Sequence, residues 1–295
     1  MDNISAAKNA SPGLYLVKAP RAGTANREQI DIVAVHGLSG HCVNSWTHYE
    51  KPGDDTTSTF WLRDLLPGKL PHARIMTFQY DAKIMGNENP YGVVDNAEKL
   101  LRDVRDHREE DPRRPIVFIG HSLGGIIIKS AISTANTARE NELYDIATAT
   151  KGIVFFGTPH RGADSAKWLG SIANVVSALS NQRSSKFIPI LETHSEELLE
   201  ISQDFRGWAP QYALASFYEQ EPYPTLKTVV VDKMSAIMGL AHEDILMLGG
   251  THTSMCKFSQ GDPRFDSVWR YIDRAAKGPP SLRPGRRVRR REAAY

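Results

Sequence analysis

The chain has 295 residues, 41% of them hydrophobic and 24% charged, with a formal net charge of +2, which is ordinary for a soluble globular protein with one sizeable core. Two scattered cysteines, Cys42 and Cys256, make neither a disulfide framework nor a zinc site, so a reducing compartment and a cytoplasmic location are expected. The first residues lack the apolar segment of a signal peptide, and no apolar run reaches about 18 residues, so a transmembrane span is excluded.

Positive charge is concentrated near the end of the sequence. Residues 278–295 include six arginines and one glutamate, a net charge of +5 that leaves −3 for the rest of the chain. We predict a disordered basic tail over 278–295, with a localisation signal or a peripheral contact with an anionic membrane surface as the alternative. No nucleic-acid partner is expected, because the sequence shows no basic stripe with aromatic residues outside this tail.

Short β-branched runs alternate with helical patterns in the first half of the chain. The segment after residue 125 is expected to be a helix despite its isoleucines, because a helix buried against a sheet can be apolar nearly all round. The predicted elements are strands at Asp31–Val35, Arg74–Tyr80 and Pro115–Ile119, and helices at Val93–Arg108 and from Ile126 towards Glu142.

The same alternation continues in the second half, with one interruption. Residues 161–210 contain no convincing strand, and their apolar residues have helical spacing, which predicts a helical insertion. The order of elements predicts an α/β fold with a mostly parallel central sheet and helices on both faces. The other predicted elements are strands at Gly152–Phe156, Tyr212–Tyr218 and Lys227–Val231, and a last helix at Phe265–Ala276.

One large domain is therefore expected over residues 30–277, after an N-terminal extension at 1–29. We interpret the insertion at 161–210 as a cap over a substrate pocket. Trp168 and Leu169 lie in its apolar stripe and are expected to contact an apolar substrate. The alternative is that this stripe packs on the sheet.

The residues from Gly120 to Gly124 match the pattern G-x-S-x-G, with a β-branched strand before them and an apolar helix after them. In this context the pattern is typical of a sharp strand-to-helix turn that presents a serine nucleophile. Residues two positions before and after the serine must be small, so that the strand and the helix can approach closely. Ser122 is the predicted nucleophile.

A serine hydroxyl needs a base to accept its proton. Where a G-x-S-x-G turn carries the serine, the order along the chain is Ser, acid, His, so histidines after Ser122 are favoured. His252 lies in a loop rich in glycine, serine and threonine, expected to follow the last central strand, and is the predicted base. His242, with acidic neighbours in the same region, is the weaker alternative.

A carboxylate should orient the imidazole and stabilise its protonated form. Glu219 ends the predicted strand before the last one, which is the expected position. Asp232, at the end of the strand predicted at Lys227–Val231, and Glu243, further along, remain as alternatives.

Two backbone N–H groups should bind the negatively charged oxygen that forms during acyl transfer. The residue after the nucleophile, Leu123, supplies one donor, and the loop after an early strand supplies the other. The glycines of the segment His36–Gly40 allow the backbone to approach a substrate there, so Leu38 is the predicted second donor. His36 is expected to brace the loop.

Four sequence blocks together carry a family resemblance: His36–Gly40, Gly120–Gly125, Phe155–Gly162 and His252–Phe258. Over roughly Ile30 to Ile272 the chain resembles the serine esterase/lipase-like α/β-hydrolases. This group includes the serine-active-site-containing protein family and related fungal hydrolase domains. The resemblance implies the α/β-hydrolase fold, with Ser122 and His252 in the triad, and it favours Glu219 as the acid. It also implies that the block around His160 forms a wall near Ser122 without a catalytic role for His160.

The expected function is that of a serine hydrolase that cleaves a carboxylic ester, lipid-like or otherwise apolar, through an acyl-enzyme. Thioester or amide hydrolysis and an activity like that of GPI inositol deacylases are the enzymatic alternatives. A signalling or scaffold module with a vestigial site is the alternative from another class. This chemistry requires no metal or organic cofactor, and none is expected.

Overall fold

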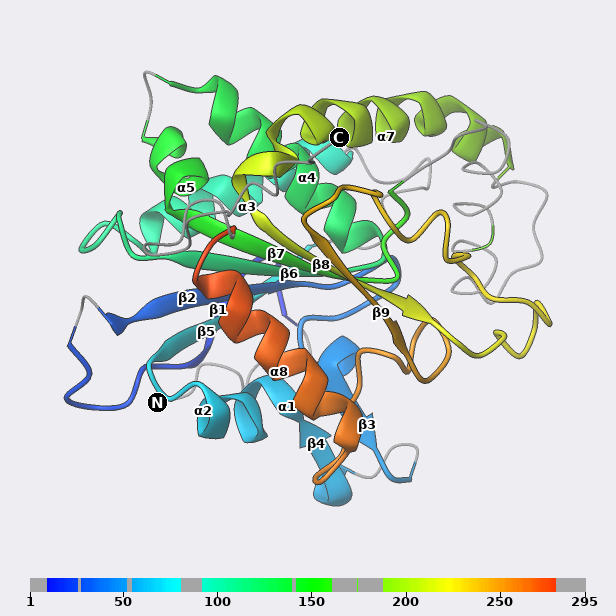
Figure 1. Cartoon of the computed structure of the whole chain (residues 1–295), viewed down its shortest axis with the longest axis horizontal. Coiled ribbons are helices and arrows are strands. Elements are labelled where there is room, and N and C mark those ends of the chain that lie inside the picture. The colour runs from blue at the N-terminus through cyan, green and yellow to red at the C-terminus, as the bar shows by residue number, and fades with distance from the viewer. Residues whose placement is uncertain are drawn as a thin grey trace, which may run out of the picture.

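A mostly parallel sheet forms the centre of the molecule (Figure 1). The computed structural model describes residues 10–25, 28–51, 55–80, 92–139, 142–160, 174 and 188–279. Within them the sheet has seven strands in the order β1-β5-β2-β6-β7-β8-β9, and only the pair β1–β5 is antiparallel. The strands are β1 (Gly13–Lys18), β2 (Ile30–Val35), β5 (Ala73–Gln79), β6 (Ile116–His121), β7 (Thr150–Phe156), β8 (Ala213–Glu219) and β9 (Glu243–Leu248).

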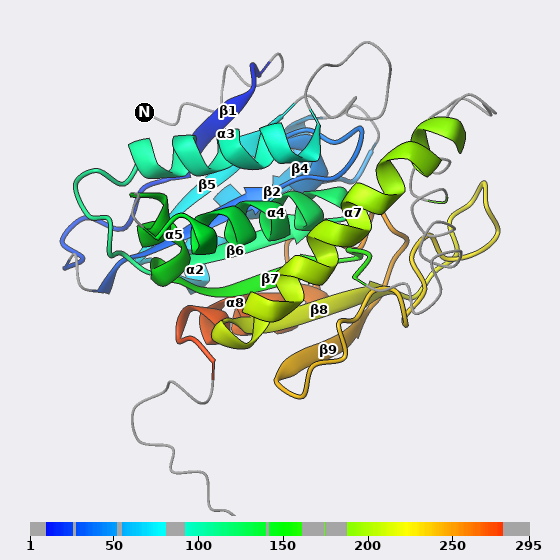
Figure 2. The ribbon, with the colours of Figure 1, turned by 90° about the horizontal axis from the view of Figure 1, so that it is seen from above.

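Helices cover both faces of the sheet. The first face carries α3 (Val93–Asp106), α4 (Leu123–Thr137), α5 (Leu143–Ala149) and α7 (Ile188–Trp208), which is followed by a 3₁₀ turn at Ala209–Gln211. The view from above in Figure 2 shows the helices α3, α4, α5 and α7 lying over this face. The second face carries α1 (Trp61–Asp64), α2 (Leu66–Lys69), α8 (Pro263–Ala276), a small hairpin of β3 (Thr47–Tyr49) and β4 (Ser58–Phe60), and 3₁₀ turns at Asn44–Trp46 and Asp55–Thr57.

The central strands are apolar along their whole length because both of their faces are covered. All six residues of β2 are buried. Ile32 and Ala34 belong to the core on the α8 side, and Val33 and Val35 belong to the core on the α4 side. The predicted fold class, a mostly parallel sheet with helices on both faces, is confirmed.

The helix α4 begins directly after Ser122 and includes the isoleucine run at 126–128, as predicted. It packs against α3, α5 and α7 as well as the sheet, so its apolar residues are buried nearly all round. This burial outweighs the weak helix propensity of isoleucine. The central helix therefore has a fixed position behind the nucleophile turn.

The first strand of the sheet, β1, lies within the segment expected as an N-terminal extension. It pairs with β5, Leu14 opposite Phe78, and buries Leu14 and Val17. The strand was not identified from the sequence, although Leu14–Val17 are apolar, because so short an apolar run does not by itself indicate a strand.

The strand predicted at Lys227–Val231 is wrong. These residues form a loop, in which Val230 and Val231 are buried, and the last strand is β9. The β-branched run is buried by packing rather than by pairing, and the Val231 N–H donates to a carboxylate instead of a neighbouring strand. Between its ends, strand β9 alternates partly buried residues with exposed ones, and Ile245 and Met247 are the exposed ones.

The helical insertion expected at 161–210 is only partly described. Except for Asn174, residues 161–187 lie outside the described residues, among them Trp168 and Leu169. The helix α7 packs against α4, and Leu198, Ile201 and Phe205 are buried there. No helix in the described ranges is long and apolar enough to cross a membrane.

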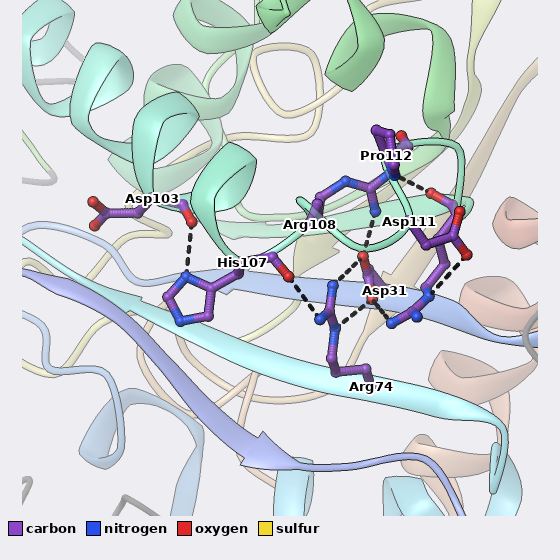
Figure 3. Close-up of polar contacts among 8 residues, drawn as sticks. Asp31, Arg74, Asp103, His107, Arg108, Asp111 and Pro112 are labelled. Carbon is purple, nitrogen blue, oxygen red and sulfur yellow. Dashed lines mark hydrogen bonds and ion pairs between the residues drawn. The ribbon is translucent and has the colours of Figure 1, made fainter.

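A buried cluster of charges lies at the amino end of the central strands (Figure 3). Asp31 on β2 is fully buried, and Arg74 binds its carboxylate through two nitrogens at 2.7 and 2.8 Å. Arg108 donates to the same carboxylate, and Arg114 lies 3.5 Å from it. One carboxylate thus joins β5, the end of α3 and the residues before β6.

Asp31→Asn is expected to lower the free energy of unfolding by about 3–5 kcal/mol, because the buried guanidinium of Arg108 and the partly buried ones of Arg74 and Arg114 would lose their shared carboxylate. Urea unfolding followed by tryptophan fluorescence measures this loss. Glu98→Gln is the matched control, since it breaks an exposed pair with Arg102 at 2.6 Å that is worth about 0.5 kcal/mol. Equal losses for the two variants would contradict a supporting role of the buried cluster.

Candidate active site

Ser122 lies at a sharp turn between β6 and α4, near the carboxyl ends of the parallel strands. Its φ of 53° and ψ of −127° place a non-glycine residue in a strained backbone region. The Ser122 N–H donates to Phe156 O at 2.9 Å, and Gly125 N donates to Ser122 O at 3.1 Å as α4 begins. The turn is therefore held from the strand side and from the helix side.

The two glycines of the motif are required by close contacts. A Cβ atom at Gly120 would lie 2.6 Å from Gly125 Cα, between the strand and the helix. A Cβ atom at Gly124 would lie 2.2 Å from His36 O. The first contact is the close approach of strand and helix that the sequence predicts, and the second brings the segment His36–Gly40 against the start of α4.

His252 follows β9 and is brought to Ser122 across 130 positions of sequence. Its Nε2 lies 2.9 Å from Ser122 Oγ, and both side chains are fully buried. A turn holds the loop, since Met255 N donates to Thr251 O at 2.9 Å. Trp61 Nε1 donates to Cys256 O at 2.9 Å and ties the same loop to α1.

Glu219, the last residue of β8, completes the chain of contacts. Its Oε1 lies 3.2 Å from His252 Nδ1 and accepts a hydrogen bond from Val231 N at 2.7 Å. A carboxylate only accepts, so Nδ1 carries the imidazole proton and Nε2 can accept from the Ser122 hydroxyl. The structure thus brings together the three side chains that the sequence analysis selected.

The alternative residues lie elsewhere and have other partners. Asp232 accepts from Met234 N at 2.8 Å and caps a short turn. Glu243 accepts from Met238 N at 2.9 Å, at the amino end of β9. His242 Nε2 lies 3.3 Å from Ala209 O. Glu219 is therefore the acid that the geometry favours, and His252 the base.

The two predicted oxyanion donors lie on either side of Ser122. Leu123 is the first residue of α4, where a backbone N–H has no partner within the helix. Leu38 follows Gly37, whose Cβ, if present, would lie 2.9 Å from Ser122 Cβ. In the described part of the chain, neither the Leu38 N–H nor the Leu123 N–H donates a hydrogen bond. Both groups can therefore donate to a substrate oxygen.

His36 braces the loop that contains Leu38, together with a residue that the sequence analysis did not select, Tyr80. The two rings stack with centroids 4.2 Å apart, and the Tyr80 hydroxyl donates to His36 O at 2.9 Å. Burial lowers the pKa of His36 to about 4, so the ring is neutral near pH 7. His36 Nδ1 can then donate to Gly37 O at 2.9 Å.

His160 follows β7 and is buried. Its N–H donates to Ser235 O at 2.6 Å, and its ring packs edge-on against Phe155 at 4.5 Å. Among the described residues no group of three or more His, Cys, Asp or Glu side chains could hold a metal ion.

A comparison with protein families identifies the family to which the chain belongs. Residues 31–193 match the family model described as "Putative serine esterase (DUF676)". The chain belongs to this serine esterase family. The match covers the strand before Leu38, the nucleophile turn and α4, and membership supports ester hydrolysis as the general activity.

Two relatives of this esterase family member are the proteins named SERAC1 from Bos taurus and Homo sapiens. The bovine protein is 27% identical over 268 residues, which cover 85% of this chain. The human protein is 26% identical over 280 residues, which cover 89% of this chain. The chain spans only about two fifths of each relative, 39% and 41% of their lengths.

Among solved structures, the chain is similar to the mature form of the Bacillus licheniformis lipase BlEst2. The TM-score is 0.53, with 16% identity over 89% of this chain and 99% of the lipase. At this identity the likeness concerns the fold, and it agrees with the predicted α/β-hydrolase class.

A buried lysine connects the helix behind Ser122 to its surroundings. Lys129 on α4 is 1% exposed, and its Nζ donates to Pro159 O at 3.3 Å and to Ser202 Oγ on α7 at 3.2 Å. Burial lowers the pKa of Lys129 to about 7, although the negative charge of Glu243 acts in the opposite direction. A charged residue inside the apolar run of residues 126–132 was the sequence signal that could have identified it.

The pKa of Lys129 predicts a pH-dependent stability. Between pH 7 and about 10.4 the unfolded chain keeps the proton that the folded chain has lost, so stability rises with pH across this window. From pH 7 to pH 9.5 the wild type should gain about 3 kcal/mol relative to Lys129→Met. Urea unfolding of both proteins at the two pH values measures this gain, and an unchanged difference would contradict the lowered pKa.

Proposed function

We propose that this esterase family member cleaves carboxylic esters with Ser122 as nucleophile, His252 as general base and Glu219 as the orienting acid. The observation that carries the proposal is the continuous buried contact from Ser122 Oγ to His252 Nε2 at 2.9 Å and from His252 Nδ1 to Glu219 Oε1 at 3.2 Å. Such an arrangement is what acyl transfer through a serine requires.

In the first half of the reaction, Ser122 Oγ attacks the ester carbonyl carbon while its proton passes to His252 Nε2. The Glu219 carboxylate stabilises the imidazolium that forms. The carbonyl oxygen becomes negatively charged and accepts hydrogen bonds from the N–H groups of Leu38 and Leu123. The positive end of α4 points towards the same oxygen.

The tetrahedral intermediate then collapses, and the ester oxygen leaves as an alcohol with the proton from His252, which completes acylation. An acyl group remains bound to Ser122 Oγ. A water molecule then gives a proton to His252 and attacks the acyl carbon. Ser122 leaves as the protonated hydroxyl, and the carboxylic acid is released.

The proposed substrates are esters with an apolar acyl group. Support comes from the apolar stripe at the start of the segment 161–210, where Trp168 and Leu169 would contact the acyl chain. A cytoplasmic location belongs to the same proposal, since Cys42 and Cys256 are free thiols.

A fluorophosphonate probe tests the chemistry, because it phosphonylates an activated serine. We expect the intact mass of the wild type to increase by one probe adduct and that of Ser122→Ala to stay unchanged. A folded wild type that does not react would instead favour the scaffold alternative.

A panel of p-nitrophenyl esters of increasing acyl length, an acyl thioester and a phospholipid then tests the substrate class. A preference for the acetyl ester or the thioester would overturn the apolar ester proposal.

A further inference from the structure

His121, the residue before the nucleophile, is placed between the two loops that complete the site. It is the last residue of β6 and is 5% exposed. Its Nε2 lies 2.8 Å from His252 O, and the two imidazole rings have centroids 5.0 Å apart. On the other side, a Cβ at Gly37 would lie 3.0 Å from His121 Nδ1. The ring therefore fills the space between the segment His36–Gly40 and the loop that carries His252.

The direction of the hydrogen bond is set by chemistry. A backbone carbonyl only accepts, so His121 Nε2 must carry a proton. No other group in the described ranges donates to His252 O. Without His121 this buried carbonyl would lose its partner, which typically costs about 1–3 kcal/mol.

The environment keeps His121 neutral. Burial, with smaller contributions from the nearby His252 and Lys257, lowers the pKa of His121 to about 3. A neutral ring can donate to His252 O without placing a second positive charge next to His252 when that residue becomes an imidazolium. Because its pKa is so low, His121 is a poor proton acceptor near pH 7 and does not compete with His252 as a base.

We propose, on the basis of the function proposed above, that His121 is a positioning residue. Its Nε2–H fixes the backbone of the loop that carries His252, and so sets the distance from His252 Nε2 to Ser122 Oγ. Residue 121 is joined to Ser122 by the chain and to His252 by the hydrogen bond. The His121 ring thereby fixes the position of His252 relative to Ser122.

Two substitutions separate positioning from simple packing. In His121→Gln the amide nitrogen can reach the position of the imidazole Nε2, whereas in His121→Asn the side chain is one methylene shorter and does not. We expect kcat of His121→Gln to stay within about threefold of wild type and that of His121→Asn to fall by about 10- to 100-fold, with little change in KM, because a displacement of about 1 Å at a reacting group costs about 100-fold.

Thr150→Val is the matched control for a lost buried hydrogen bond to a carbonyl. Thr150 Oγ1 donates to Ile146 O at 2.7 Å, at the amino end of β7 and away from Ser122. Its loss should lower the thermal midpoint and leave kcat unchanged.

The measurement is kcat and KM for a p-nitrophenyl ester, together with the rate of fluorophosphonate labelling. Equal kcat values for His121→Gln and His121→Asn in folded proteins would overturn the positioning role. The same holds if the loss appears in KM alone. An inactive, unlabelled wild type would instead overturn the proposed function itself, so the two failures are distinguishable.

Discussion

Ser122→Ala is expected to lower kcat for a short p-nitrophenyl ester by a factor on the order of 10⁵ to 10⁶, with little change in KM. Alanine removes the only atom that would form a bond to the acyl carbon, while the oxyanion donors and the binding surface stay in place. The residual rate would come from these remaining groups and an attacking water molecule.

The matched control for this substitution is Ser130→Ala. Ser130 is a buried serine on the same helix, α4, and has no part in the proposed reaction. Steady-state kinetics of the two variants at equal folded concentration measure the effect. If Ser122→Ala kept the turnover of wild type, hydrolysis at this turn would be refuted, whatever the labelling experiment showed.

Glu219→Gln is expected to lower kcat by a factor on the order of 10³ to 10⁴. If the amide oxygen faces His252, the negative charge that would stabilise the imidazolium is lost. If the amide nitrogen faces His252, Nδ1 must accept, the proton moves to Nε2, and Nε2 can no longer accept from Ser122. Either orientation removes the function of the base.

Asp232→Asn is the control for Glu219→Gln, since Glu219 and Asp232 are both carboxylates near the ends of apolar runs. The Asp232 carboxylate accepts from Met234 N, Ser235 N and Ser235 Oγ, so its loss should affect local stability and change kcat by less than about threefold. The kinetics of the two variants measure the difference. The opposite ranking would transfer the role of the acid to Asp232.

These two predictions and that for His121 concern one set of contacts. Ser122 and His121 are carried by the end of β6, Glu219 by the end of β8 and His252 by the loop after β9. The carboxyl ends of parallel strands meet at one edge of the sheet, which is where α/β folds place their ligands. Asp31 lies at the opposite end of β2, so its substitution should reduce stability without a direct effect on the site.

Local sequence determined the nucleophile turn and the central strands. A β-branched run, the glycines at 120 and 124 and an apolar helix lie within a short stretch, so the motif could be recognised from neighbouring residues. The strands around it were predictable for a similar reason, because a strand covered on both faces must be apolar throughout.

Only the tertiary structure decided which acid contacts His252 and how the edges of the sheet are built. Glu219, Asp232 and Glu243 all follow or begin plausible strands, and the choice depends on where loops far apart in sequence meet. The strands β1 and β9 and the arginine partners of Asp31 were not predicted for the same reason. Periodicity reports which side of an element is buried, whereas side-chain contacts between distant elements depend on packing that no local pattern encodes.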